Sequence, residues 1–161
     1  MIKVQFGCGP HELEGWDNRD INTDIRLPLP FKDRSVDFIF AEHVIEHVTS
    51  REAFRFLIEC HRILKRSGVM RLVFPDILKL ANSSDDIPNR WKRINDVIQG
   101  WGHCSVWSHE IGRTMLNAAG FDWVYSEDYS KSRFPELNNI ERHHLSSSLA
   151  TLESTILEAT K

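Results

Sequence analysis

The sequence predicts one α/β domain built on a mostly parallel sheet, and three observations support this. Short apolar runs typical of strands alternate along the chain with amphipathic stretches typical of helices. The first apolar run leads directly into a Gly-x-Gly turn, Gly7-Cys8-Gly9, which is how such sheets bring bare backbone close to a ligand. The chain has 161 residues, enough for one hydrophobic core, so we expect a single domain over residues 1–161.

The first two strands indicate a shortened sheet. We expect the first strand at about Lys3–Phe6 and a short second strand that ends at Asp20. Only thirteen positions separate Gly7 from Asp20, against about 20 in a full nucleotide-binding unit. The intervening helix must therefore be a single turn or missing. Asp24 follows so soon that a further strand is vestigial or absent.

The middle of the chain predicts a strand, a long helix and another strand. After a strand at about Val36–Phe40, a helix opens with the capping box Thr49-Ser50-Arg51-Glu52 and is expected to stop near Gly68. Its expected inward stripe is Phe54, Leu57, Ile58, His61 and Leu64. The charges expected on its solvated face are Arg51, Glu59, Arg62 and Lys65. The next strand is expected over Val69–Phe74.

The last third predicts a lid, a helix and two strands. Residues 81–105 have the least regular pattern and are expected to form a lid over the site. Ser108 is expected to cap a helix that runs to about Ala119, with Ile111, Met115 and Ala118 inward. A strand over Phe121–Ser126 and an antiparallel strand over Ser154–Thr160 complete the prediction.

Three blocks then stand in a fixed order: 24–31 (DIRLPLPF), 35–48 (SVDFIFAEHVIEHV) and 61–69 (HRILKRSGV). In this order they closely resemble the class I S-adenosylmethionine-dependent methyltransferases, in their small type 11-like branch. The resemblance covers most of the chain and implies a trimmed Rossmann-like sheet, mostly parallel with an antiparallel C-terminal strand, and helices on both faces. It also implies S-adenosylmethionine as the cofactor. The full G-x-G-x-x-G pattern is broken, since its third position is Glu12.

The resemblance implies a cofactor contact for each part of S-adenosylmethionine. The methionine end would meet the backbone around Phe6, Gly7, Cys8 and Gly9. Asp20 would accept hydrogen bonds from the ribose, a role that Asp17 or the next aspartate, Asp24, could fill instead. Asp24 and Ile25 would meet the adenine.

Glu42 and His43 directly follow a strand, and the resemblance implies positions under the sulfonium and at the mouth of the acceptor site. Methyl transfer is an in-line displacement that needs alignment and, for a hydroxyl or amine acceptor, removal of a proton. An imidazole suits that task at neutral pH, so His43 is the first candidate base. His103, projecting from the lid, is the second. The alternatives are that His43 caps a helix and that His103 holds the lid backbone.

His43-Val44-Ile45-Glu46-His47 also has the H-x-x-E-H spacing of some zinc hydrolases. On a helix, His43 and His47 could share one metal ion. The short pattern arises easily by chance, so we expect no metal. The cluster Arg142-His143-His144 is expected to be a solvated loop, with contact to the acceptor or to another subunit as the alternatives.

Composition narrows the function. A net charge of −3 does not favour a nucleic-acid partner. Three cysteines without C-x-x-C spacing indicate free thiols, and no leader or membrane span is expected, so we predict a cytoplasmic protein. We expect a methyltransferase for a small-molecule or saccharide acceptor, with a homodimer as a possible assembly. The alternatives are a non-catalytic S-adenosylmethionine or S-adenosylhomocysteine binder and a metal-dependent enzyme using His43, Glu46 and His47.

Overall fold

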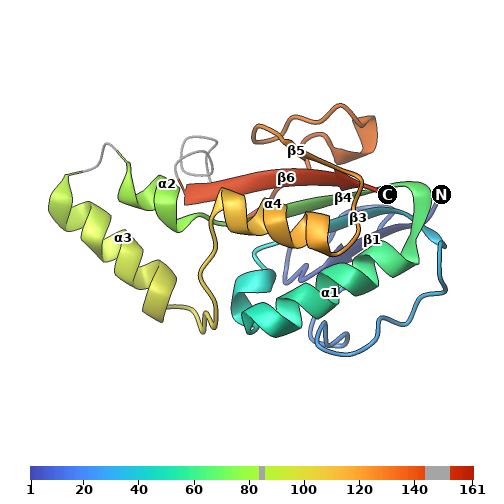
Figure 1. The fold of residues 1–161 in the computed structure, drawn as a ribbon, viewed down its shortest axis with the longest axis horizontal. Coiled ribbons are helices and arrows are strands. Elements are labelled where there is room, and N and C mark those ends of the chain that lie inside the picture. Colours follow the sequence, from blue (N-terminus) through green and yellow to red (C-terminus); the bar gives the residue numbers. More distant parts are fainter. Residues whose placement is uncertain (84–85, 144–152) are drawn as a thin grey trace.

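A computed structural model of the chain describes residues 1–83, 86–143 and 153–161. It contains a six-stranded sheet in the order β2-β1-β3-β4-β6-β5. Figure 1 shows the sheet at the centre, with helices α1 and α4 packed along one face. The strands are β1 (Lys3–Phe6), β2 (Asp17–Arg19), β3 (Val36–Glu42), β4 (Leu64–Pro75), β5 (Trp123–Ser126) and β6 (Ser154–Thr160). The helices are α1 (Ser50–Ile63), α2 (Ile77–Ala81), α3 (Ile87–Gln99) and α4 (His109–Ala118), with 3₁₀ turns η1 (Ile45–His47) and η2 (Pro135–Leu137).

The strand directions match the predicted sheet. β2, β1, β3 and β4 are parallel to one another, and β6 is antiparallel to both of its neighbours, β4 and β5. The prediction of a trimmed sheet is also confirmed, because residues 7–16, all described, form turns and no helix. Without that helix, the path from β1 to β2 is too short for a full nucleotide-binding unit.

α1 begins where the capping box predicts but ends earlier. Thr49 caps it together with Glu52, yet the helix stops at Ile63, and Leu64 already starts β4. The expected end near Gly68 is wrong because tertiary partners satisfy the last carbonyls: Ser35 N–H donates to Ile63 O at 2.8 Å, and Lys161 Nζ donates to His61 O.

The inward faces of α1 and α4 differ from the predicted stripes by a small rotation. α1 buries Ala53, Phe56, Leu57, Cys60 and Ile63. Ile58 is exposed, whereas Phe54 and His61 are partly buried. On α4 the buried residues are Gly112 and Leu116, while Ile111 and Ala118 are exposed. Which residues point inward depends on how each helix lies on the twisted sheet, and spacing alone leaves that rotation open.

Three of the charged side chains expected on the solvated face of α1 form hydrogen bonds or ion pairs with other segments. Arg62 donates to the carbonyls of Leu29 and Phe31 at 3.0 and 2.9 Å, and Glu59 Oε2 accepts from Leu29 N–H at 2.8 Å. Lys65, just beyond the helix, pairs with Asp37 at 2.8 Å. The expectation of a merely solvated face is therefore wrong for these three residues.

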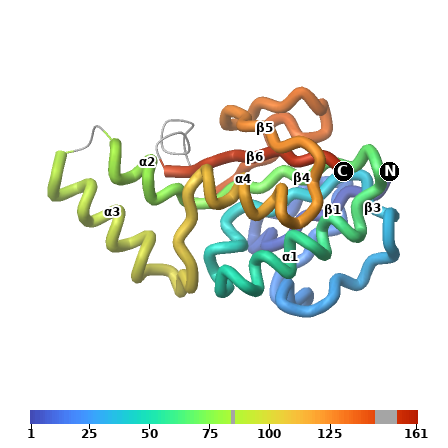
Figure 2. Tube along the Cα trace, viewed as in Figure 1, coloured from blue at the N-terminus to red at the C-terminus, as the bar shows by residue number. Residues whose placement is uncertain are grey.

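The two faces of the sheet are covered differently. On the first, α1 and α4 bury a large apolar cluster that includes Phe6, Phe56, Phe74 and Trp107. On the second, a smaller cluster packs under irregular segments, with Leu13, Leu137 and Ile140 over Phe40 and Val73 of the sheet. Figure 2 traces the C-terminal part of this cover, the orange chain after β5. Within the described residues, the helical cover expected on this second face is reduced to the 3₁₀ turn η2.

α2 and α3 project beyond the sheet (Figure 1), and α3 lies within residues 81–105, the segment expected to form the lid. Among the described residues, no helix is long and apolar enough to cross a membrane. Cys8, Cys60 and Cys104 are all free, as predicted.

Candidate functional site

The carboxyl ends of β1, β2, β3 and β4 meet at one edge of the sheet because these strands are parallel and adjacent. Open α/β sheets bind ligands at this edge. The residues that follow the strand ends are Gly7, Asp20, His43 and Asp76. The topology therefore gathers the predicted site segments along one line.

The glycine turn after β1 has the backbone shape that its residues predict. Gly7 and Gly9 have φ values of +67° and +48°, which side-chain-bearing residues rarely adopt. A Cβ on Gly7 would lie 2.4 Å from Val44 Cγ2, so this glycine also lets the turn pack against the segment after β3. A Cβ on Gly9 would meet nothing within 4 Å. Gly9 therefore borders open space.

Two of the backbone amides of this turn donate hydrogen bonds to β2. Gly7 and Cys8 both donate to Arg19 O, at 2.7 and 3.3 Å, which ties the turn to β2. Within the described residues, the Gly9 amide has no such partner. Burial raises the pKa of the Cys8 thiol, followed in effect by the nearby Asp20. Cys8 is therefore held as a neutral thiol beside the turn.

The three aspartates near β2 have different surroundings. Asp17 pairs with Arg19 at 2.7 Å, and Asp24 is held in a forked ion pair by Arg26 at 2.8 Å. The side-chain hydrogen bond from Arg26 lowers the pKa of Asp24 to about 2. Within the described residues, the Asp20 carboxylate accepts no hydrogen bond. Asp20 is thus the aspartate whose oxygens remain available.

Glu42, the last residue of β3, is a buried carboxylate. Its Oε2 accepts the backbone N–H groups of Arg142 and His143, at 2.9 and 3.2 Å. Burial raises the pKa of Glu42 to about 7, against the opposing effect of these amides. Glu42 therefore holds the chain after Ile140 across the end of β3.

His43 lies next, in a left-handed conformation with φ +53°. Its Nδ1 lies 2.9 Å from Glu46 Oε1, and its Nε2 lies 3.4 Å from Ser154 Oγ. Its ring stacks on His143 with centroids 4.0 Å apart. Burial, followed by the nearby His103 and His47, lowers the pKa of His43 to about 3, so the ring is neutral at physiological pH.

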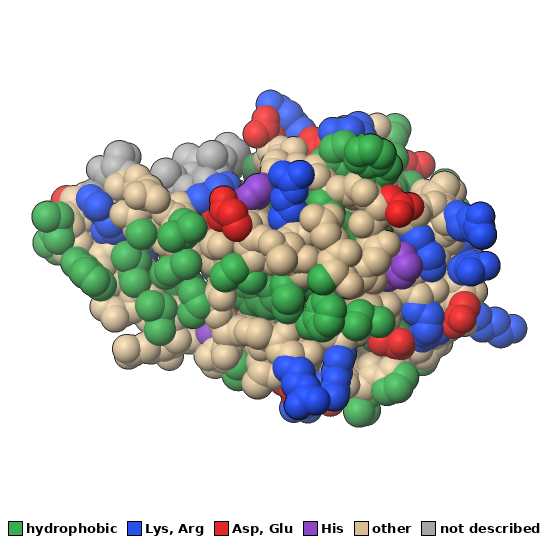
Figure 3. All heavy atoms as spheres, in the orientation of Figure 1, with side chains coloured by type: hydrophobic (Ala, Val, Ile, Leu, Met, Phe, Trp, Pro, Cys, Tyr) green, Lys and Arg blue, Asp and Glu red, His purple; other side chains and the backbone are tan. Residues whose placement is uncertain are grey.

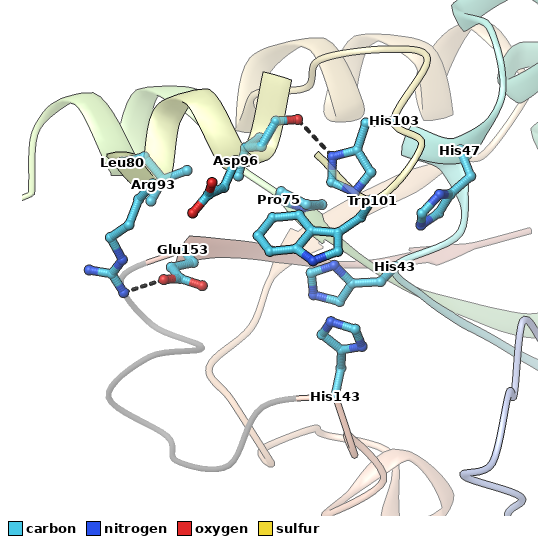
Figure 4. Close-up of a pocket in the computed structure, with 11 residues that line it drawn as sticks. His43, His47, Pro75, Leu80, Arg93, Asp96, Trp101, His103, His143 and Glu153 are labelled. Carbon is cyan, nitrogen blue, oxygen red and sulfur yellow. Dashed lines mark hydrogen bonds and ion pairs between the residues drawn. The ribbon is translucent and has the colours of Figure 1, made fainter. Parts of the chain in front are cut away.

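A cavity of about 500 Å³ opens beside His43. Figure 4 shows its wall, to which the strand ends contribute His43 and Pro75, and the lid contributes Trp101 and His103. Arg93 of α3 pairs with Glu153 across one side of the cavity. The remaining lining residues are His47, Leu80, Asp96, Val97 and His143. Within the described part of the segment 81–105, five residues thus form one wall of the cavity: Arg93, Asp96, Val97, Trp101 and His103.

His103 lies in this wall and holds the lid backbone, which is the structural role considered for it from the sequence. Its Nδ1 lies 2.7 Å from Val97 O, so this nitrogen carries the proton and holds the end of α3. The other side of its ring faces His47, with centroids 4.8 Å apart in an edge-on arrangement. The structure therefore brings both predicted base candidates, His43 and His103, to one cavity.

The H-x-x-E-H segment does not form the metal pair considered from the sequence. The helical turn here is a 3₁₀ turn that starts only at Ile45, so His43 and His47 are not one α-helical turn apart. His43 contacts Glu46 instead. His47 groups with Glu46 and His103, whose ligand atoms all lie within 4.8 Å of one another.

Some residues at the site carry no sequence signal that predicts them. Asp96 and Glu153 are single acidic residues without a motif, and they reach the cavity only through the placement of α3 and β6. Asp76 is a hub: its carboxylate accepts from the amides of Leu78, Lys79 and His109 and from Thr155 Oγ1. Its position after a strand and before a helix was a usable signal for a helix cap. His144 of the predicted polar cluster lies outside the described residues.

Parts of the chain are similar in sequence to known methyltransferases. The family model described as a methyltransferase domain matches residues 13–72. A sterol 24-C-methyltransferase of Gibberella zeae is 28% identical over 102 residues, covering 63% of this chain and 26% of that protein. A malonyl-[acyl-carrier protein] O-methyltransferase of Coxiella burnetii is 45% identical over 58 residues, covering 35% of this chain and 20% of that protein. The chain thus spans about a quarter or less of the length of these relatives.

Comparison with solved structures identifies the fold. A SAM-dependent methyltransferase from Archaeoglobus fulgidus superposes with a TM-score of 0.63 over 99% of this chain and 85% of the other, at 17% identity. A possible histamine N-methyltransferase from Thermotoga maritima gives 0.60 over 99% and 82%, at 19% identity. Both have the fold that the order of strands predicts.

Proposed function

We propose that this chain, which has the class I methyltransferase fold and the methyltransferase-domain sequence pattern, transfers a methyl group from S-adenosylmethionine, the cofactor of that family. The proposal depends on one observation. The glycine turn after β1 packs on Val44, and the neighbouring His43 lines the 500 Å³ cavity. A methyl donor on the turn would therefore lie next to an acceptor in the cavity, which is the proximity that a displacement reaction needs.

The cofactor would lie across the ends of β1, β2 and β3. Phe6, Gly7, Cys8 and Gly9 would meet its methionine end, with the Gly9 amide as the available donor. Asp20, whose carboxylate accepts no hydrogen bond within the described residues, would accept the ribose hydroxyls. Asp24 and Ile25 would meet the adenine. Because Arg26 holds the Asp24 carboxylate, we assign this contact to the backbone of the segment and to the Ile25 side chain.

The acceptor would occupy the cavity as a small molecule or a saccharide. The side chains around it combine an aromatic surface, Trp101, with polar groups that include Asp96 and Glu153. Trp101 is 69% exposed, so its ring is available to a flat or ring-shaped ligand. This mixture suits a small organic molecule that has both apolar surface and polar groups.

Proton removal from the acceptor would fall to His43, oriented by Glu46. A pKa of about 3 makes His43 alone a weak base. His43 Nδ1 lies 2.9 Å from Glu46 Oε1, a contact that orients the ring and makes Nε2 the nitrogen that would receive the proton. His103 stays the second candidate, because its Nε2 is the nitrogen not engaged with Val97.

A non-catalytic binder of S-adenosylmethionine or S-adenosylhomocysteine is the second candidate function. The observation that favours it is the short cradle, with a β2 of three residues and no helix between β1 and β2. Mass spectrometry of candidate small molecules and saccharides incubated with S-adenosylmethionine would separate the two functions. A mass increase of one methyl group in an acceptor supports the enzyme.

Two further proposals concern the cellular location and the oligomeric state of the protein. Free cysteines support a cytoplasmic location. Exposed apolar side chains on α3, namely Ile87, Trp91 and Ile98, support a homodimer. Figure 3 shows hydrophobic side chains gathered over α2 and α3. Light scattering after size-exclusion chromatography measures the mass, and a monomer at micromolar concentration would contradict the homodimer.

The cofactor assignment is tested by removing one aspartate at a time. We expect Asp20→Ala to weaken S-adenosylmethionine binding by about 1–3 kcal/mol, the loss typical of a hydrogen bond to a charged group. Isothermal titration calorimetry measures it. The control is Asp17→Ala, because the Asp17 carboxylate is already engaged by Arg19. Equal affinity losses in the two variants would contradict the ribose role of Asp20.

A further inference from the structure

Three side chains of the types that ligate metals meet beside the cavity. Glu46 and His47 come from η1, and His103 comes from the segment after α3. One ligand atom from each lies within 4.8 Å of the other two. Ligands about 2.0–2.2 Å from a shared ion lie roughly 3–3.5 Å apart, so small side-chain rotations would close the set on an ion.

Glu46 provides an independent sign of a missing partner. Its side chain is 1% exposed, and Oε1 faces His43 Nδ1 at 2.9 Å. Its other oxygen, Oε2, is buried without a hydrogen-bond partner in the part of the chain that the structure describes. A buried carboxylate oxygen left without a donor is costly, and a bound cation removes that cost.

His47 and His103 each have a ring nitrogen that can bind a metal ion. The carbonyl of Val97 can only accept a hydrogen bond, so His103 Nδ1, at 2.7 Å, is protonated and Nε2 carries the lone pair. A backbone carbonyl that orients the second nitrogen is typical of metal-bound histidine. Neither ring nitrogen of His47 has a hydrogen-bond partner among the described residues. His43 orients Glu46 in the same way, from the second carboxylate oxygen.

We propose that Glu46, His47 and His103 form a binding site for a divalent first-row transition-metal ion, for which Zn²⁺ is the natural probe. Two imidazoles and one carboxylate are a ligand set that such ions favour. His47 and His103 both line the cavity, so a coordination position left open by three protein ligands would face it. That position would hold water or an oxygen of a molecule in the cavity. The site stands on these contacts and does not depend on the methyl-transfer proposal; with the ion bound, His103 Nε2 is a ligand, and His43 is then the base candidate of the two.

The test uses the full chain, without an affinity tag and treated with a chelator. We expect isothermal titration with ZnCl₂ and elemental analysis to give one ion per chain. His47→Ala should weaken binding at least tenfold; the His47 ring is exposed and forms no hydrogen bond within the described residues, so the fold should tolerate the change. Glu46→Gln should have a similar effect. The matched control is His109→Ala on α4, which removes a histidine from another part of the surface and should leave the affinity unchanged.

A Co²⁺ titration gives a readout of the ligands themselves. The visible absorption of protein-bound Co²⁺ should appear in the unaltered chain and change in His103→Ala. Absence of stoichiometric Zn²⁺ binding in the unaltered chain would overturn the proposal. So would unchanged Zn²⁺ affinity in both His47→Ala and Glu46→Gln, since the ion would then lie elsewhere. Binding of S-adenosylmethionine, measured separately, decides the proposed function and not this site.

Discussion

At the scale of single residues, the buried carboxylate of Glu42 at the end of β3 holds a neighbouring chain segment through hydrogen bonds. Glu42 is 8% exposed and accepts two backbone amides from Arg142 and His143 on one oxygen. Its other oxygen has no hydrogen-bond partner among the described residues. Burial disfavours the charged form of the carboxyl group relative to the neutral, protonated form. It therefore raises the pKa of Glu42 to about 7.

The pKa of Glu42 makes a prediction about pH. Between its unfolded pKa of about 4.5 and its folded pKa of about 7, the folded protein binds more protons than the unfolded chain, so this residue's contribution to stability falls as pH rises through that window. Glu42→Gln cannot ionise and keeps a carbonyl oxygen for the two amides. We expect the free energy of unfolding of the variant, relative to the unaltered protein, to rise by about 3 kcal/mol between pH 4 and pH 8.

Urea denaturation at the two pH values measures this difference. The control is the same pair of measurements on Glu14→Gln, which changes a glutamate at an exposed loop position. A Glu42→Gln effect that does not vary with pH would show that the carboxyl ionises as freely in the folded protein as in the unfolded chain.

At the scale of elements, α4 shows how a local pattern combines with close packing. Ser108 caps the helix by accepting from Ile111 N–H at 3.4 Å, as its place in the sequence predicts. Gly112 determines how closely α4 approaches the sheet. A Cβ there would lie 2.4 Å from Phe74 Cζ and 3.2 Å from Leu157 Cδ1, so glycine lets α4 approach the sheet.

Gly112→Ala should therefore destabilise the protein. In an exposed helix, this change stabilises by about 1 kcal/mol because alanine favours the helix. Here the methyl group overfills the core, and we expect a net loss of about 1–2 kcal/mol in the free energy of unfolding. Thr114→Ala, at an exposed position of the same helix, should change it by less than about 0.5 kcal/mol. Thermal or urea denaturation measures both, and a stabilised Gly112→Ala protein would refute the packing argument.

At the scale of the whole molecule, one buried ion cluster joins the C-terminal segment to the sheet. Arg71 in the middle of β4 is fully buried and pairs with Glu141 at 2.5 Å and Glu158 at 2.6 Å. The same guanidinium donates to the carbonyls of Asp128 and Lys131. Residues 127–141 are thereby held over the second face of the sheet, the face that α1 and α4 do not cover.

Arg71→Met should be among the most damaging single substitutions in the chain. It leaves two buried carboxylates without their cation, and breaking a buried ion cluster in this way costs about 3–5 kcal/mol. Arg113→Met, at an exposed site on α4, is the matched control and should cost less than about 0.5 kcal/mol. Urea denaturation measures both. A loss below about 1 kcal/mol for Arg71→Met would mean that the segment is held by its apolar contacts alone.

The sequence by itself determined the features that depend on neighbouring residues. The strand runs, the caps at Thr49 and Ser108, the glycine turn and the shortened path to Asp20 all follow from hydrogen bonding and spacing within a few positions. The order of the three motif blocks then indicated the class of fold, which the structural neighbours confirm.

Only the tertiary structure decided what depends on distant segments. It ended α1 at Ile63, buried Arg71 beneath residues 127–141, and brought His103 to Glu46 and His47. None of these has a local signal, because each depends on the direction in which one element lies against another. Local sequence specifies the elements, whereas the packing of the two apolar faces of the sheet specifies which side chains converge at its edge.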